Sequence, residues 1–398
     1  MFEILKPKTQ HLIPNFMFSS FHYPHYFTKK IREEIGEIYA HSAIANLALS
    51  MMALFEPIFL YSVLGFTINQ VLVFTVIVYG VYILCIPFGG KMASMYGYKH
   101  SIALSIPFHI VYWLILISAQ QSSNLAFVGA VAYGLSKSFY WPGYHSLIAR
   151  YSDEGQVGRE FGVVYSLISL TLVAGPLIAG AISQHVGFTA MFTVTALIYC
   201  FSLFPLFRHK EIFTPKVYEY KQTIELYKQY PKKALGYFGF GEEMFALNIW
   251  PIYIFIVVKN YETAGLLATV SSLVAAGLAL IVGRITDQYS KRVLIKIGAF
   301  FTGLVWLGRF VANAFWSTFF MDSLARTSKE ISIIPISTVT YIRAEATHVV
   351  PYIVFFEQSL AIGKLTACFV GIILFTLTGS FVVLFIAAAL YSLLYMLV

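Results

Sequence analysis

The sequence is poor in charged residues and in cysteine. Asp, Glu, Lys and Arg make up 12% of its 398 residues, about half of their share in ordinary soluble domains. The three cysteines, Cys85, Cys200 and Cys368, fall in apolar segments and show neither the pattern of a disulfide framework nor the spacing of metal ligands. This composition argues against a soluble domain, and the cysteines predict no metal site.

The sequence also lacks the motifs of several enzyme classes. It has no Gly-rich phosphate loop ending in Lys-Ser or Lys-Thr, no His-Glu-x-x-His and no nucleophile elbow. We therefore predict neither an enzyme nor a cofactor, and the energy for any active process would come from a proton or other ion gradient. Residues 1–38 lack the basic start, apolar stretch and cleavage site of a signal peptide, and none is expected.

Apolar residues, in contrast, dominate the chain. They make up 58% of it, and the mean hydropathy is +0.73. Apolar stretches of about 20 residues, each long enough to cross a hydrocarbon core of about 30 Å, follow one another from residue 39 onward. Because a chain in the membrane core must satisfy its own backbone polar groups, these stretches predict helices. The twelve predicted spans cover residues 39–64, 68–89, 101–119, 124–149, 160–183, 188–207, 234–258, 263–283, 292–314, 316–342, 349–377 and 380–398.

One long polar connection separates two sets of six spans. It covers residues 208–233 and carries seven Lys or Arg. The residues before the first span predict a short interfacial helix over 29–37, with its charges among the lipid headgroups. The predicted organisation of this all-α membrane protein is a cytoplasmic or interfacial segment (1–38), a six-helix bundle (39–207), a cytoplasmic linker (208–233) and a second six-helix bundle (234–398).

The basic residues indicate the orientation of the chain. Of its 27 Lys and Arg, five fall in predicted spans and one in an outer loop, and the other 21 lie on one side. Cytoplasmic loops collect such residues, so both termini and the linker are predicted to face the cytoplasm from a plasma (inner) membrane. The net charge of +8 is spread over these loops, where it meets membrane lipid, and no nucleic-acid partner is predicted.

The two halves of the chain match each other at a fixed offset. Five pairs of identical or similar residues are each separated by 193 positions. Tandem halves of six helices, related by an axis along the membrane normal, are a known plan of transporters. The matched pairs are Gly90 with Gly283, Lys99 with Arg292, Trp113 with Trp306, Pro142 with Pro335 and Arg150 with Arg343.

Two loops at matching repeat positions carry a common motif. The first reads Gly90-Lys-Met-Ala-Ser94-Met-Tyr-Gly97-Tyr-Lys99, and the second Gly283-Arg-Ile-Thr-Asp287-Gln-Tyr-Ser-Lys291-Arg292. They resemble the loop signature of the major facilitator superfamily, although Ser94 stands where that family has an acid. The resemblance implies two bundles around a cavity lined by helices 1, 4, 7 and 10, and a functional monomer. It also implies a cytoplasmic gate formed by Gly90, Gly97, Lys99, Gly283, Asp287, Lys291 and Arg292.

The fifth predicted span contains a stretch of small residues around a proline. It is similar to the Gly-Pro motif of the antiporter branch of that family, with Ala179 where the family prefers glycine. Small residues and proline also serve helix packing and kinking. We predict a helix-packing motif of Gly175, Pro176 and Gly180, and the sequence leaves open whether transport is antiport, symport or uniport.

Ionisable residues within spans are costly and mark candidate functional sites. In the fourth and tenth spans, polar residues recur at spacings of three to four and therefore share one face of each helix. The mechanistic hypothesis is that Lys137 and Arg326 bind an anionic or polar group of a small-molecule solute while a carboxylate carries a proton. The predicted solute-binding residues are Tyr133, Lys137, Trp141, Tyr144, Arg326 and Glu330, and the predicted proton-coupling residues are Glu242, Glu243 and Glu357.

Other readings of these charges remain open. Asp322, Arg326 and Glu330 are spaced to neutralise one another along one helix. Arg309 and Asp322, near the outer ends of adjacent spans, predict a structural pair. Two further charges toward the outer side, Glu56 and Lys364, fit either snorkelling side chains or an outer gate.

The predicted function is secondary active transport of a small organic solute by alternating access, coupled to protons. A channel is not favoured, because the sequence has no repeated carbonyl filter and no ring of like charges. The alternative is a non-transporting membrane scaffold or sensor with the same fold, to which the missing loop acid at Ser94 gives some support. Fold alone does not choose the solute.

Overall fold

The computed structural model describes residues 29–150, 171, 173–211 and 213–398, with residues 29–35 and 279–288 described through their backbone alone. All secondary structure in these ranges is helical. Eight of the described helices are long and apolar enough to cross a membrane, judged by length and composition. The predicted all-helical fold is therefore confirmed, whereas the arrangement of twelve spans in two six-helix bundles remains a prediction.

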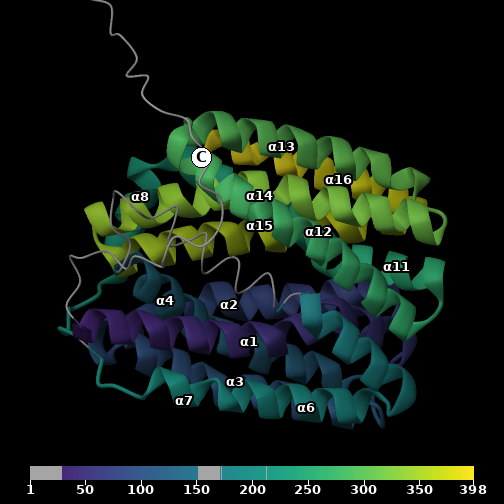
Figure 1. Cartoon of the computed structure of the whole chain (residues 1–398), viewed down its shortest axis with the longest axis horizontal. Helices are drawn as coiled ribbons and strands as arrows, with labels where there is room; N and C mark the ends of the chain where they lie inside the picture. Colours follow the sequence, from purple (N-terminus) through teal and green to yellow (C-terminus); the bar gives the residue numbers. More distant parts are fainter. Residues whose placement is uncertain (1–28, 151–170, 172, 212) are drawn as a thin grey trace, which may run out of the picture.

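The helices of the first half pack side by side (Figure 1). They are α1 (Lys29–Ser62), α2 (Ile68–Tyr96), α3 (Tyr98–Ala119), α4 (Leu125–Arg150), a helix over 173–185, α6 (Phe188–Phe201) and α7 (Leu203–Leu206). α4 packs against both α2 and α3, and α1 packs against α6. The predicted helix over 29–37 is present but is not a separate element, because it continues directly into the first span as part of α1; its place among the lipid headgroups stays a prediction. Part of the fifth predicted span lies outside the described residues.

The second half forms a matching group of helices. They are α8 (Tyr220–Gln229), α9 (Pro231–Tyr237), η1 (Phe238–Gly241), α10 (Glu242–Met244), η2 (Phe245–Ile249), α11 (Trp250–Val258), α12 (Tyr261–Gln288), α13 (Lys291–Gly308), η3 (Arg309–Val311), α14 (Phe315–Ala346), α15 (Val349–Thr378), α16 (Phe381–Leu393) and η4 (Leu394–Leu397). α14 packs against α12 and α13, as α4 does against α2 and α3. α2 and α12 begin 193 residues apart, and so do α3 and α13, so the helix boundaries recur at the offset of the sequence repeat.

The seventh predicted span is a continuous helix whose turns change in pitch. Between α9 and α11 the helix tightens to a 3-10 turn in η1 and widens to a π-helix in η2. Gly239 and Gly241 permit close neighbours here, since a Cβ on Gly241 would lie 2.6 Å from the backbone oxygen of Gly363. π-helical segments within spans are frequent at functional sites. Glu242 and Glu243 lie in the short α10, between the two irregular turns.

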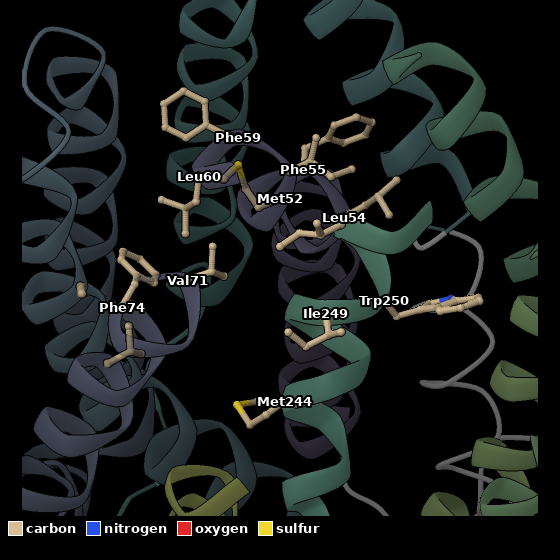
Figure 2. Close-up of a cluster of buried hydrophobic side chains, with 14 of the residues drawn as sticks. Met52, Leu54, Phe55, Phe59, Leu60, Val71, Phe74, Met244, Ile249 and Trp250 are labelled. Atoms are coloured by element: carbon tan, nitrogen blue, oxygen red, sulfur yellow. The ribbon is translucent and has the colours of Figure 1, made fainter. Parts of the chain in front are cut away.

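One hydrophobic core joins the two halves. Figure 2 shows side chains of α1 and α2 in the same cluster as Met244, Ile249 and Trp250 of the seventh span. α15 of the second half also packs along α2 of the first half, in the middle of the molecule in Figure 1. Side chains between these helices are therefore shared by both halves, and this is where the candidate site lies.

The small residues of the fifth span fit against both halves. Gly175 and Gly180 are buried; Gly175 faces Ser50 of α1, and a Cβ on Gly180 would lie 2.8 Å from the backbone oxygen of Tyr261 in α12. Pro176 in turn faces Gly265 of α12. These close approaches give the stretch a packing role in addition to any role in transport.

Replacing Gly180 with leucine should destabilise this packing. Overpacking a tight contact costs about 1–3 kcal/mol, so the melting temperature of the purified protein should fall. Gly80→Leu is the matched control, because Gly80 lies within α2 and a Cβ there would meet no atom within 4 Å. Equal melting temperatures for the two variants would contradict a packing role for Gly180.

Candidate functional site

A cavity of about 310 Å³ lies between α1, α2, α4 and the seventh span. Aromatic side chains make up much of its wall, including Tyr79, Tyr133 and Trp141. Two charged residues, Glu56 and Lys137, also line it. We call this space the first cavity.

Lys137 lies in the first cavity without a carboxylate partner. Its Nζ is 4.7 Å from the ring centroid of Tyr133, 5.4 Å from that of Tyr79 and 5.8 Å from that of Trp141. Ring faces attract an ammonium group but do not neutralise it. Within the described part of the chain, no Asp or Glu lies within ion-pairing distance of Lys137. The ammonium group can therefore bind an anionic or polar group that enters the cavity.

A second cavity, also of about 310 Å³, adjoins the first and shares Ser50, Ala53 and Leu247 with it. Its wall carries three acids, and each is paired with a base. Glu242 pairs with Lys329, the Oε2 atom of Glu243 lies 2.7 Å from Nζ of Lys364, and Nε of Arg326 donates to Oδ2 of Asp322 at 2.8 Å. The second cavity has more charged side chains in its wall than the first, and all three of its acids are paired.

Glu242 is the most strongly held of these acids. The indole Nε1 of Trp306 donates to its Oε1 at 2.7 Å, and Lys329 and the Tyr395 hydroxyl both donate to its Oε2. Nζ of Lys329 also donates to the Tyr395 hydroxyl at 2.7 Å, and lies 3.4 Å from Oε1 of Glu243. Both oxygens of the buried Glu242 carboxylate are thus satisfied.

A separate polar bridge joins the two halves in the first third of α15. Nε2 of His145 in α4 lies 2.9 Å from Oε1 of Glu357, and the hydroxyl of Tyr82 in α2 donates to Oε2 of Glu357 at 2.7 Å. Nδ1 of His145 is hydrogen-bonded to the hydroxyl of Tyr341 in α14. Four helices therefore meet at one histidine and one carboxylate.

Comparison with known proteins decides the family. The sequence model of the Major Facilitator Superfamily matches residues 39–321. The chain belongs to this superfamily. The crystal structure of the human organic anion transporter MFSD10 (TETRAN) shares the fold, with a TM-score of 0.67, 11% sequence identity, and coverage of 93% of this chain and 100% of that one. Together with the apolar helices, membership of the superfamily makes the chain a multi-pass membrane protein.

Two curated proteins also match part of the chain. The Na(+), Li(+), K(+)/H(+) antiporter of Planococcus maritimus is 27% identical over 136 residues, which cover 33% of this chain and 32% of the antiporter. The methylenomycin A resistance protein of Bacillus subtilis (strain 168) is 26% identical over 121 residues, 30% of this chain and 26% of that protein. The chain thus spans about a third and about a quarter of these relatives.

The structure places the predicted residues of this superfamily member in different surroundings. Tyr133, Lys137 and Trp141 line the first cavity, whereas Arg326, Glu242 and Glu243 line the second. Glu357 belongs to the bridge with His145. Tyr144 and Glu330 line neither cavity, and the Tyr144 hydroxyl instead accepts a hydrogen bond of 3.3 Å from Ser42 in α1.

Three predictions about charges at the outer side need correction. Glu56 lines the first cavity rather than snorkelling to the surface, and its role in an outer gate stays a prediction. Lys364 is buried and paired with Glu243; its position halfway along the 30-residue α15 was the sequence signal for this depth. Asp322 pairs with Arg326 rather than with Arg309, whose guanidinium group stacks on two indole rings.

The first signature loop of the superfamily is held by acids from elsewhere in the chain. Nζ of Lys99 donates to Oε2 of Glu37 in α1 at 2.6 Å, and both residues are buried. The carboxylate of Glu211, in the linker, accepts hydrogen bonds from the backbone N–H groups of Tyr98 at 2.8 Å and of Lys99 at 3.2 Å. Two distant acids thus contact the cationic end of this loop, which has no acid of its own at Ser94.

The remaining predicted gate residues are only partly described. Gly90 packs against Tyr218 of the linker, and Gly97 adopts a φ of 116° that favours glycine. Lys291 and Arg292 begin α13 with partly or fully exposed side chains. Gly283 and the Asp287 side chain lie outside the described side chains, so the charged gate of the second loop stays a prediction.

Removing the acid from the pair of Glu37 and Lys99 should destabilise the protein strongly. Breaking a buried ion pair costs about 3–5 kcal/mol, because it leaves one charge buried without its partner. The melting temperature of Glu37→Gln should therefore fall well below that of Glu219→Gln, a control at an exposed linker position. A melting temperature of Glu37→Gln equal to that of the control would show that the pair does not hold the loop.

Proposed function

We propose that this superfamily member is a secondary active transporter that moves a small organic solute by alternating access, with an acidic or polar group of the solute bound at Lys137. The observation that carries the proposal is a lysine without an ion pair in an aromatic-walled cavity of about 310 Å³ between the two halves. The names of the similar proteins, an organic anion transporter, a cation/proton antiporter and a drug resistance protein, agree with transport but do not name one solute.

The proposed architecture completes what the described residues show in part. Twelve spans form two six-helix bundles, 39–207 and 234–398, joined by a cytoplasmic linker. The protein works as a monomer in the plasma membrane with both termini in the cytoplasm. The recurrence of the helix boundaries at an offset of 193 residues supports this division, and the lopsided placement of Lys and Arg supports the orientation.

Among the three carboxylates proposed for proton coupling, Glu357 has the most suitable surroundings. Glu242 and Glu243 are each paired with a lysine of the same half of the chain. Glu357 of α15 instead pairs with His145 of α4, in the other half. A proton bound by the Glu357 carboxylate would remove its negative charge and weaken this contact between α4 and α15. Proton binding at Glu357 would thereby be linked to the relative position of the two halves.

The test of transport begins with a solute. A thermal-shift screen of the purified protein against metabolites, sugars, organic acids and cationic drugs identifies ligands, because a ligand of the folded state raises the melting temperature. The radiolabelled hit is then measured in proteoliposomes with an imposed pH gradient. Accumulation above the equilibrium level is the expected result. A bound solute that never crosses the membrane would instead favour the scaffold or sensor.

Replacing Glu357 with glutamine should uncouple transport from protons. In proteoliposomes, Glu357→Gln should still exchange labelled for unlabelled solute, but it should lose accumulation driven by the pH gradient. Glu262→Gln is the matched control, because Glu262 contacts His185 in a similar pair that is largely exposed. If Glu357→Gln accumulates solute as the wild type does, Glu357 is not the coupling residue.

A further inference from the structure

Arg309, at the start of η3, is a buried cation in the wall of the second cavity. Its side chain is 2% exposed. The guanidinium carbon lies 3.5 Å from the ring centroid of Trp306 and 4.1 Å from that of Trp250. Both indole rings thus contact the guanidinium group, whose Nε and Nη1 atoms have no hydrogen-bond partner in the described part of the chain.

The acids around Arg309 are occupied by other donors. Oδ1 of Asp322 accepts a hydrogen bond of 2.8 Å from the indole of Trp250, and Oδ2 accepts from Arg326. Glu242 accepts from the indole of Trp306 and from Lys329. Glu243, the third acid of the wall, pairs with Lys364 and Lys329. The three acids are thus paired with three other bases, and Arg309 is the additional positive charge.

Such an arrangement is costly unless a further group completes it. A buried polar atom without a partner, above all on a charged group, loses its interactions with water and gains nothing in return. Indole rings stabilise the guanidinium group through its faces. Its N–H groups, however, point outward from the edge of the plane, in the fork geometry that matches a carboxylate. The rings thus leave Nε and Nη1 of Arg309 without a hydrogen-bond partner in the described part of the chain.

We propose that the second cavity binds a carboxylate-sized anion at Arg309. The proposal rests on the proposed transport function and narrows its substrate to anions. Each of the two adjoining cavities then presents one cation without a carboxylate partner, Lys137 in the first and Arg309 in the second. A solute with two acidic groups fits both positions. Alternatively, the solute has one acidic group, and an independent small anion binds at Arg309 beside it. The group that Arg309 binds has the same chemistry in both cases.

Tryptophan fluorescence tests the proposal, because two of the five tryptophans contact Arg309. Detergent-purified protein is titrated separately with sodium succinate, acetate and chloride. Arg309→Gln, Arg309→Lys and Lys137→Gln are titrated in parallel, so that general salt effects cancel. We expect a saturable emission change in the wild type, with binding at least tenfold weaker in Arg309→Gln and intermediate in Arg309→Lys.

The three anions distinguish the source of the bound group. Succinate binding weakened by both Lys137→Gln and Arg309→Gln would identify a solute with two acidic groups. Acetate or chloride binding weakened by Arg309→Gln alone would identify an independent small anion at the same site. No saturable change in the wild type with any of the three, or equal affinities in the wild type and Arg309→Gln, would overturn the proposal.

The fluorescence titration does not require transport. It also does not depend on the folding of any single variant. If Arg309→Gln does not yield a monodisperse protein, the wild type and the charge-retaining Arg309→Lys still decide between a saturable and a flat titration. Anion binding without transport in proteoliposomes would overturn the proposed function alone. Transport of a solute without anion binding at Arg309 would overturn only this inference.

Discussion

Replacing Lys137 with glutamine should abolish tight solute binding and reduce uptake at least about thirtyfold, because truncating one partner of a buried charge pair costs about 2–5 kcal/mol. In the first cavity this ammonium group is surrounded by rings and has no carboxylate partner within the described residues, so the anionic group of the solute supplies one. Uptake of the solute identified by thermal shift, measured in proteoliposomes at equal protein content, is the readout.

Two further variants make the Lys137 result specific. Lys137→Arg keeps the charge and should retain a measurable part of the uptake, with altered solute affinity. Lys259→Gln removes an exposed lysine that caps α11, and uptake should stay close to that of the wild type. Unchanged uptake and affinity in Lys137→Gln would refute the assignment of the first cavity as the solute site.

Replacing Glu242 with glutamine should have the largest effect on stability. The change leaves the Lys329 ammonium group without its main partner and weakens the hydrogen bonds from Trp306 and Tyr395. Loss of one partner of a buried pair costs about 3–5 kcal/mol. We expect a large drop in melting temperature, whereas Glu225→Gln, at an exposed position in α8, should leave it unchanged.

A double variant separates the pair from its surroundings. The double variant Glu242→Gln and Lys329→Met removes both charges of the pair, so no charge of the pair is left without its partner. The double variant should therefore be more stable than Glu242→Gln alone. Strictly additive losses would show that the two residues do not stabilise each other. If Glu242→Gln alone is as stable as the wild type, Glu242 has no stabilising role and remains a candidate for proton coupling.

The sequence alone predicted the membrane spans and the family, because both depend on local patterns or on repeated motifs. Apolar runs of the required length predicted α2, α3 and α4 closely, since the membrane imposes that length on every helix. The loop motifs indicated the superfamily that the match over residues 39–321 shows. The three-to-four spacing of Tyr133, Lys137 and Trp141 placed them on one face, and the structure brings all three to one cavity.

The depth of the charged side chains in the membrane and their ion-pair partners were harder to predict from the sequence. The sequence suggested that Lys364 lies near the outer side and that Arg309 pairs with Asp322. In the structure, Glu243 of the seventh span pairs with Lys364, and Trp250 and Trp306 lie against the guanidinium group of Arg309. The seventh span contains 3-10 and π-helical turns, which change the direction of its side chains from that in a regular α-helix, and no pattern of apolar residues reveals such turns.

The sequence by itself determined that the chain is helical, membrane-spanning and built on a repeat, because span length, loop charge and the 193-residue offset are properties of single segments or of their order. Only the tertiary structure decided which charges are paired. Partners such as His145 and Glu357, or Glu37 and Lys99, come from helices far apart in the chain. Their contacts depend on the rotation and tilt of whole helices, which the packing of the helices against one another fixes and no local pattern records.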